Sequence, residues 1–225
     1  MTDGGYELGD AWVAREAEGD LHQRFVETDF DDAGWEPIAV PGHWRCTPAF
    51  AASDGPVLYR HRFPATPLAE GRRRFLTLEG VFYYGDVWLD GGYLGATEGY
   101  FAPHSFEITD AGGSGVEEHV LAVEVACPQE GDRRAKRMVT GVFSHWDGLD
   151  PDWNPGGLWR PVRLSDSGPV RLSGLRCLCI EATEDRGRLL LSLVRSGLDR
   201  IPCAPRQGER LLGLSPSAAT RSLRD

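Results

Sequence analysis

The residues with the clearest chemical character lie in one stretch, residues 143–159, with the sequence FSHWDGLDPDWNPGGLW. The stretch gathers three of the seven tryptophans, three aspartates and the only asparagine of the chain. Proteins bind sugars through aromatic rings that stack on C–H faces and through carboxylates or amides that hydrogen-bond the hydroxyls. The stretch is therefore the best candidate for a functional loop, and the chemistry it predicts is carbohydrate recognition.

Other aromatic residues leave two interpretations open. Four of them suit either a second stacking face for a sugar or packing at a domain interface: Tyr83, Tyr84, Tyr100 and Phe101. His43, next to Trp44, suits either a ligand contact or a structural corner between extended segments. The residue types alone do not decide between binding and packing at these positions.

Motifs for bond-making chemistry are absent from the sequence. The chain has no G-x-S-x-G nucleophile elbow, no H-x-x-x-H pair for zinc and no C-x-x-C pair. Cys177 and Cys179 share one face of a strand, but no second ligand pair accompanies them, so a filled core position is favoured over a metal site. We expect no catalytic residue, no metal and no cofactor in this chain.

Composition and charge exclude several classes of function. The formal net charge is −10, which argues against a nucleic-acid footprint, because that needs clustered Lys and Arg. No apolar run approaches membrane-spanning length, and the N-terminus carries acids where a secretory signal has a basic start. Five scattered cysteines indicate no disulfide framework. We expect a cytoplasmic protein without nucleic-acid or membrane partners.

Short alternating segments must position the candidate residues. Residues 80–95 predict a β-hairpin, because Val87 and Leu89 face one way and Asp90-Gly91 suits a type I′ turn. Residues 58–63, 75–79 and 120–126 alternate in the same way, and no long run has helical period. The inward rows predicted to form the core are Leu76/Leu78, Val87/Leu89 and Leu121/Val123/Val125. The fold class is therefore all-β, a sandwich or jelly roll.

The chain changes texture after a linker at residues 165–169. Two further strands, near residues 175–179 and 189–193, surround a turn at 184–187, but an immunoglobulin-like sandwich needs about 100 residues. From Arg195 the alternation stops, and residues 195–225 carry six arginines against three acids. We expect a first domain over 1–165, the beginning of a second over 166–194, and an irregular tail over 195–225. The tail is either an out-of-frame, non-native ending or an ordinary disordered terminus.

Six motifs in order resemble one protein family. They are WEPIAVPGHW, VLYRHRF, RRRFLTLEGVFYYGDVWLDGGYLG, GYFAPHSFEITD, HVLAVEV and GGLWRPVRL. Together, from about Leu8 to Leu164, they resemble the N-terminal sugar-binding domain of glycoside hydrolase family 2, which includes β-galactosidases, β-glucuronidases and β-mannosidases. The resemblance implies a galactose-binding-like jelly roll followed by an immunoglobulin-like domain, here incomplete. The family's Asn-Gly hairpin tip is Asp90-Gly91 in this chain.

The resemblance also says where the chemistry belongs. The family hydrolyses glycosides with two glutamates on a TIM barrel, the first usually preceded by Asn, whereas Pro155 follows the single asparagine here. A barrel needs about 250 further residues. The chain is therefore expected to be the non-catalytic N-terminal portion of a β-glycosidase, inactive alone, with the missing barrel as its intramolecular partner. The alternative is a free-standing carbohydrate-binding module or lectin-like protein.

In the family, a loop of this domain reaches the barrel's active site and touches the substrate. The resemblance thus implies that residues of the aromatic and acidic stretch bind a β-glycoside. The substrate-binding candidates are Asp147, Asp150, Asp152, Trp153 and Asn154. The competing interpretation is that Trp153, Trp159 and Arg160 only pack the domain edge against its neighbours.

Overall fold

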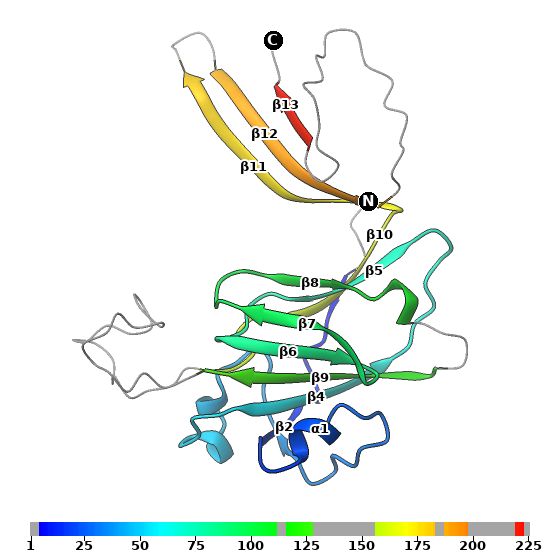
Figure 1. The fold of residues 1–225 in the computed structure, drawn as a ribbon, viewed down its shortest axis with the longest axis vertical. Coiled ribbons are helices and arrows are strands. Elements are labelled where there is room, and N and C mark those ends of the chain that lie inside the picture. The colour runs from blue at the N-terminus through cyan, green and yellow to red at the C-terminus, as the bar shows by residue number, and fades with distance from the viewer. Residues whose placement is uncertain (1–4, 112–115, 128–155, 183–186, 198–218, 223–225) are drawn as a thin grey trace, which may run out of the picture. The chain divides into compact units, whose positions relative to one another are not determined.

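The computed structural model describes residues 5–111, 116–127, 156–182, 187–197 and 219–222 (Figure 1). The chain divides into two compact units. Unit 1 comprises Met1–Ala69 with Arg74–Asp166, and unit 2 comprises Glu70–Arg73 with Ser167–Asp225. None of the helices in the described ranges has the length and hydropathy needed to span a bilayer.

Unit 1 is built from two sheets. The first has the order β1 (Tyr6–Glu7), β10 (Val162–Ser167), β5 (Arg73–Leu78) and β8 (His104–Glu107). The second has the order β3 (Glu36–Pro37), β2 (Val13–Glu16), β4 (Val57–Pro64), β9 (Glu118–Ala126), β6 (Tyr84–Leu89) and β7 (Gly92–Glu98). Short helices lie in the connections: α1 (Leu21–Arg24), η1 (Trp44–Cys46), η2 (Pro48–Phe50) and η3 (Thr109–Ala111). The predicted all-β, jelly-roll type of sandwich is confirmed.

The core of unit 1 contains the inward rows predicted from sequence. Leu76, Leu78, Val87, Leu89, Leu121, Val123 and Val125 are all buried. They belong to one hydrophobic cluster that also includes Trp12, Tyr59 and Phe82. The period of two in each strand therefore sets which side chains leave water.

A second, smaller hydrophobic cluster forms where residues 20–35 pack on strands β4 and β9. Its buried members are Phe25, Trp35, Leu58 and Ala122. Leu58 lies on the opposite face of β4 from Tyr59, so this strand is buried on both faces. A segment that covers the outer face of a sheet removes the usual alternation of buried and exposed residues.

The β6–β7 hairpin has the predicted turn. Leu89 pairs with Gly92, which leaves Asp90 and Gly91 as the loop. Both have positive φ, 50° at Asp90 and 79° at Gly91, as a type I′ turn requires. The Asp90 carboxylate accepts a hydrogen bond from the Val120 amide at 2.8 Å and lies 2.6 Å from the His119 ring nitrogen Nδ1. The side chain thus connects the hairpin tip to strand β9.

Within the described residues, unit 2 is an antiparallel sheet of three strands in the order β11 (Val170–Ala182), β12 (Gly187–Gly197) and β13 (Ala219–Ser222). The predicted strand pair is present; residues 184–186 of its predicted turn lie outside the described ranges, and Gly187 begins β12. Residues 219–222 fall in the segment predicted to be irregular, yet they pair with β12. Their pairing depends on a partner strand elsewhere in the chain, which the local sequence pattern does not reveal.

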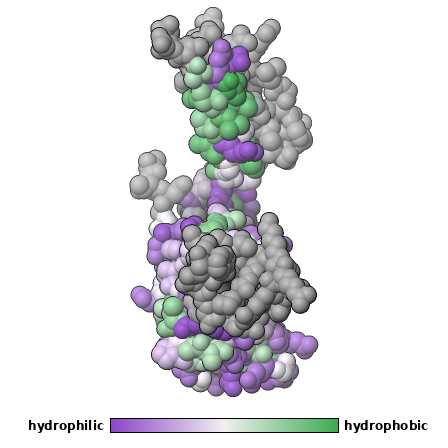
Figure 2. Space-filling model, turned by 90° about the vertical axis from the view of Figure 1, so that its left-hand side faces the viewer, coloured by the Kyte–Doolittle hydropathy of each residue, from purple (hydrophilic) through white to green (hydrophobic). Residues whose placement is uncertain are grey.

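The β11–β12 hairpin leaves many apolar side chains in water. Exposed members are Leu172, Leu175, Leu178, Ile180, Leu189 and Val194. Leu175 keeps 69% of its surface accessible. Figure 2 shows apolar residues gathered over this hairpin. A single sheet normally needs a second layer or a partner to bury such a face.

Candidate functional site

The five residues that the sequence nominates for substrate binding lie outside the described ranges. They are Asp147, Asp150, Asp152, Trp153 and Asn154. The structure does describe where the surrounding chain is anchored. The Tyr83 amide donates to the Ala126 carbonyl at 3.1 Å, at the end of β9. Phe82 and Gly157 exchange two backbone hydrogen bonds of 2.9 and 3.1 Å.

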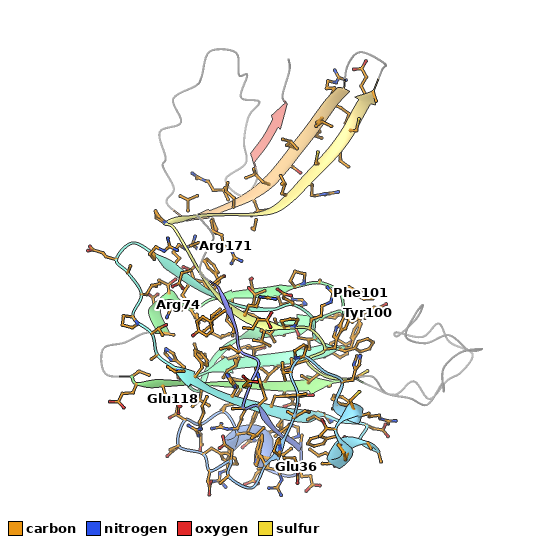
Figure 3. All side chains as sticks on the ribbon, turned by 180° about the vertical axis from the view of Figure 1, so that it is seen from behind. Glu36, Arg74, Tyr100, Phe101, Glu118 and Arg171 are labelled. Atoms are coloured by element: carbon orange, nitrogen blue, oxygen red, sulfur yellow. The ribbon has the colours of Figure 1, made fainter. Side chains whose placement is uncertain are left out.

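The two anchors bring aromatic residues together at one end of the sandwich. Within the described ranges, seven rings form a continuous set of contacts that we name the aromatic edge: His43, Phe82, Tyr83, Tyr84, Tyr100, Phe101 and Trp159. The centroids of Phe82 and Tyr100 lie 5.0 Å apart in a stack. Those of Tyr100 and Phe101 lie 4.5 Å apart in an edge-on contact. Figure 3 shows Tyr100 and Phe101 together at the end of unit 1 away from Arg74 and Glu118.

The aromatic edge has a buried layer and an exposed layer. Phe82 is fully buried and belongs to the main core. Phe101 keeps 49% of its surface accessible and Tyr84 keeps 36%. The buried layer fixes the exposed rings, because a ring packed against a close-packed core has few alternative rotamers. Of the four aromatic residues that the sequence leaves open, Tyr83 and Tyr100 are partly buried and pack against the core, whereas Phe101 and Tyr84 present accessible faces.

Trp159 is held in place from several sides. Its indole Nε1 donates to the Tyr100 carbonyl at 2.7 Å. Its ring lies parallel to His43, 6.1 Å between centroids and 4° between planes, and meets Phe101 edge-on at 5.6 Å. Gly80 lies directly beneath it, since a Cβ there would approach Nε1 to 2.7 Å. The side chain therefore packs on its own unit in a fixed orientation.

Arg160 completes the aromatic edge with its only described cation. Its guanidinium carbon lies 4.6 Å from the centroid of the Trp159 ring and 5.8 Å from that of Phe101. At these distances a guanidinium is attracted by the ring quadrupoles. The side chain is exposed, so its charge remains accessible to solvent.

The corner at His43 and Trp44 is joined to residues 156–158, beside the aromatic edge, by backbone hydrogen bonds and by close contact with a glycine. The Gly42 amide donates to the Leu158 carbonyl at 2.8 Å, and the Trp44 amide donates to the Gly156 carbonyl at 2.9 Å. A Cβ at Gly156 would lie 2.0 Å from the buried Trp44 ring, so no larger residue fits. Trp44 is therefore structural, whereas His43 stacks on Trp159 at the edge itself.

The electrostatics of the edge favour a neutral phenol. Desolvation raises the pKa of Tyr83 above its usual range, and the nearby Glu98 carboxylate adds to the shift. Tyr83 therefore keeps its proton, and its capacity to donate, throughout the physiological pH range. Hydroxyl donors, ring faces and one cation suit ligand binding.

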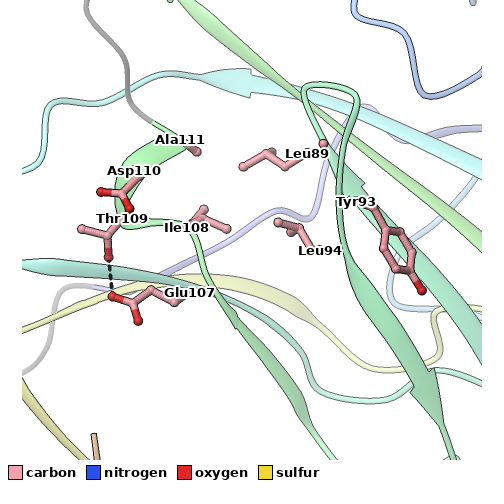
Figure 4. Close-up of a pocket in the computed structure, with 9 residues that line it drawn as sticks. Leu89, Tyr93, Leu94, Glu107, Ile108, Thr109, Asp110 and Ala111 are labelled. Carbon is pink, nitrogen blue, oxygen red and sulfur yellow. Dashed lines mark hydrogen bonds between the residues drawn. The ribbon is translucent and has the colours of Figure 1, made fainter. Parts of the chain in front are cut away.

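A pocket with a volume of about 200 Å³ lies beside the tip of the β6–β7 hairpin (Figure 4). Apolar side chains of Leu89, Leu94, Ile108 and Ala111 converge on it, and the Thr109 hydroxyl donates to Glu107 at 2.8 Å on one side.

Across the described residues, no group of three or more His, Cys, Asp or Glu side chains is arranged to hold a metal ion.

Sequence reasoning missed part of this site. Phe82 and Gly80 meet Trp159 or its neighbours from positions far away in the chain, and His43, which the sequence singles out, stacks on Trp159. The sequence feature that comes closest to revealing these contacts is the aromatic run Phe82-Tyr83-Tyr84. Alternation assigns this run to a strand, but all three of its rings belong to the aromatic edge. Long-range contacts of this kind follow from the sheet order and cannot be read from local spacing.

Comparison with known proteins relates this architecture to one family. Residues 49–156 match a family profile described as "Glycosyl hydrolase 2 galactose-binding domain-like". A β-glucuronidase from Formosa agariphila is 25% identical over 159 residues, covering 65% of this chain and 16% of that protein. The β-galactosidase large subunit of Latilactobacillus sakei is 31% identical over 120 residues, covering 38% of this chain and 19% of that protein. The chain thus spans less than a fifth of the length of these two relatives.

Solved structures share the fold. A Bacteroides uniformis β-glucuronidase is similar over 88% of this chain and 23% of its own, with a TM-score of 0.65 and 19% identity. A glycosyl hydrolase family 2 member from Bacteroides cellulosilyticus is similar over 88% of this chain and 26% of its own, with a TM-score of 0.61 and 17% identity. The profile match over residues 49–156 identifies a galactose-binding-like domain of glycoside hydrolase family 2, as the sequence motifs predict, and the solved structures share its fold.

Proposed function

We propose that this chain is the non-catalytic N-terminal portion of a family 2 β-glycosidase, an enzyme that hydrolyses O-glycosyl bonds in carbohydrate metabolism. The catalytic barrel lies outside these residues, and unit 1 braces it and contacts the carbohydrate. The small share of each relative that the chain spans supports this assignment.

The observation that carries the proposal is the aromatic edge. Its exposed rings, Phe101 and Tyr84, are held by a buried layer, and its two backbone anchors adjoin the stretch in which the sequence concentrates tryptophan, aspartate and asparagine. Rigid aromatic faces beside hydrogen-bonding side chains are the means by which proteins bind sugars. In this proposal, the edge and that stretch contact one β-glycoside.

A free-standing carbohydrate-binding module is the alternative. It requires a fold that buries its own apolar surface, whereas the β11–β12 hairpin exposes Leu172, Leu175 and Leu178. An uncovered apolar sheet favours a chain that continues into further structure over a self-sufficient module.

We also propose a reducing, cytoplasmic setting. Three cysteines in the described ranges, Cys46, Cys177 and Cys179, are exposed free thiols. Exposed thiols persist where glutathione and thioredoxin keep them reduced.

The test measures binding and hydrolysis on the same chain. Saturation-transfer NMR detects weak binding of methyl β-glycosides of glucose, galactose, glucosamine and glucuronic acid, and p-nitrophenyl β-glycosides report hydrolysis. We expect at least one glycoside to bind and none to be hydrolysed. Phe101→Ala is expected to weaken binding about fivefold, because one exposed ring contributes on the order of 1 kcal/mol of buried apolar contact.

The matched control is Tyr6→Ala, which removes an exposed ring of unit 1 outside the aromatic edge. Its affinity is expected to equal that of the wild type. Absence of binding to every glycoside, or equal losses in the two variants, would overturn the proposed site. Hydrolysis by the purified chain would overturn its assignment as a non-catalytic portion.

A further inference from the structure

The starting observation is the pairing of arginines in unit 1. Arg60, Arg74 and Arg163 each place Nε 2.7 Å from a carboxylate oxygen, of Asp32, Asp166 and Glu79 respectively. In a chain with a net charge of −10, such pairs are the common state. Arg160 differs, because across the described ranges its guanidinium contacts the rings of Trp159 and Phe101 and pairs with no carboxylate.

The geometry of stacking leaves the donors of Arg160 available. A guanidinium over an aromatic ring uses its flat face, while its five N–H bonds lie in the plane and point outward. That edge matches a carboxylate, which accepts two parallel hydrogen bonds from it. The contact with Trp159 and Phe101 therefore restricts the position of the guanidinium without consuming its hydrogen bonds.

The support beneath Arg160 is itself preorganised. Trp159 is fixed by its 2.7 Å bond to the Tyr100 carbonyl and by the parallel His43 ring. Gly80 admits the stem of Arg160, since a Cβ there would lie 3.0 Å from both Cγ and Cδ. Less conformational freedom is then lost when a ligand binds, which is the general source of affinity in preorganised sites.

We propose that Arg160 binds the carboxylate of an acidic sugar, a uronic acid unit of the glycan, while the exposed ring of Phe101 contacts the apolar face of that sugar. This inference rests on the proposed function and specifies its ligand class. Arg160 becomes the residue that distinguishes acidic from neutral sugars at the aromatic edge. Because the rest of the chain is acidic, the local cation is needed to offset its repulsion of an anion.

The test compares two ligands that differ only at C6, methyl β-D-glucuronide and methyl β-D-glucoside, by NMR titration of the full chain. We expect the glucuronide to bind about tenfold more tightly, as one charge-assisted hydrogen-bonded pair predicts. Arg160→Gln is expected to remove this preference, so that the two ligands bind with equal affinity. Arg160→Lys keeps the charge but not the fork, and is expected to retain part of the preference. The preference is also expected to shrink as NaCl is raised, because the site is exposed.

The control is Arg24→Gln, which removes an exposed arginine stacked on a ring elsewhere in unit 1, 5.8 Å from Phe30. It is expected to keep the wild-type preference. Gly80→Ala provides a second variant that displaces Arg160 while keeping its charge, and it is expected to reduce the preference. Equal affinity of the wild type for both ligands, or a preference that survives Arg160→Gln, overturns this inference and leaves carbohydrate binding intact. Tighter binding of a sulfated glycoside than of the glucuronide overturns the choice of carboxylate. Failure of the wild type to bind either ligand overturns this inference, and the proposed function falls with it if the galactoside and the glucosaminide also fail to bind.

Discussion

Arg60 is a buried cation that fastens residues 25–32 to the outer face of strand β4. Its side chain is fully inaccessible to solvent. Nε donates to the Asp32 carboxylate at 2.7 Å, and Nη1 donates to the carbonyls of Phe25 and Glu27, the latter at 3.1 Å. The guanidinium also lies 5.3 Å from the Phe30 ring centroid. Arg60→Met keeps the apolar stem and removes all of these polar contacts.

The expected loss is about 3 kcal/mol in the free energy of unfolding. Two backbone carbonyls lose a charged donor, each worth roughly 1.5 kcal/mol or more. The Asp32 side chain is 19% exposed, so water partly hydrates its carboxylate once Arg60 is removed. The expected loss of stability therefore lies near the lower end of the range of about 3–5 kcal/mol for broken buried pairs.

The matched control is Arg62→Met on the same strand. Arg62 is 36% exposed at its side chain, and its contacts to the same segment are longer, 3.4 Å to the Thr28 carbonyl and 3.6 Å to Asp32. A partly exposed pair of this kind contributes about 0–1 kcal/mol.

Urea unfolding followed by tryptophan fluorescence separates the two variants. All seven tryptophans lie at or before Trp159, so the signal reports on unit 1. With a urea dependence of about 2 kcal/mol per molar, Arg60→Met is expected to lower the midpoint by about 1.5 M, and Arg62→Met by less than about 0.5 M. Equal shifts in the two variants would refute the reasoning that burial makes the contacts of Arg60 contribute more to the free energy of unfolding than those of Arg62.

Three further predictions concern other parts of the chain. Burial lowers the pKa of His61, so the unfolded chain binds a proton at this residue more readily, and the free energy of unfolding falls as the pH drops below about 6.5. His61→Phe should reduce this loss, measured by urea unfolding between about pH 7 and pH 5. An unchanged dependence of stability on pH would contradict the role given to His61. Asp90→Ala places alanine at a φ of 50° and removes the 2.8 Å bond to the Val120 amide, so it should cost about 2 kcal/mol, whereas Asp90→Asn should cost less than half of that; equal losses by urea unfolding would exclude this account of the turn. The exposed hairpin of unit 2 should make the chain self-associate in sedimentation velocity, with Leu175→Lys shifting it toward monomer, and a monodisperse monomeric wild type would contradict this.

The sequence predicts those parts of the fold that local chemistry determines. The Asp90-Gly91 turn is such a feature, because positive φ at two successive positions selects few residue types. The alternating rows of the core are another, since burial of one sheet face imposes a period of two. The order of the six family motifs adds the topology, which alternation alone does not supply.

Other features depend on contacts across long separations. Arg60 sits in an alternating strand where its type suggests a solvent-facing position, and only the segment that covers β4 explains its burial. His43 meets Trp159 because the chain returns to the same end of the sandwich after β9. The acidic and aromatic residues that the sequence nominates remain predictions, because they fall outside the described ranges.

The backbone anchors at Phe82 and Tyr83 have a consequence for how this domain diversifies. The chain leaves the sheet after Ala126 and returns at Gly157, and both points are hydrogen-bonded to these two adjacent residues. An insertion between fixed, neighbouring ends can change in length at little cost, because each doubling of a loop adds only about 0.6 kcal/mol of closure entropy. The sandwich is therefore expected to tolerate changes in the length of the chain between Ala126 and Gly157 without redesign of the core.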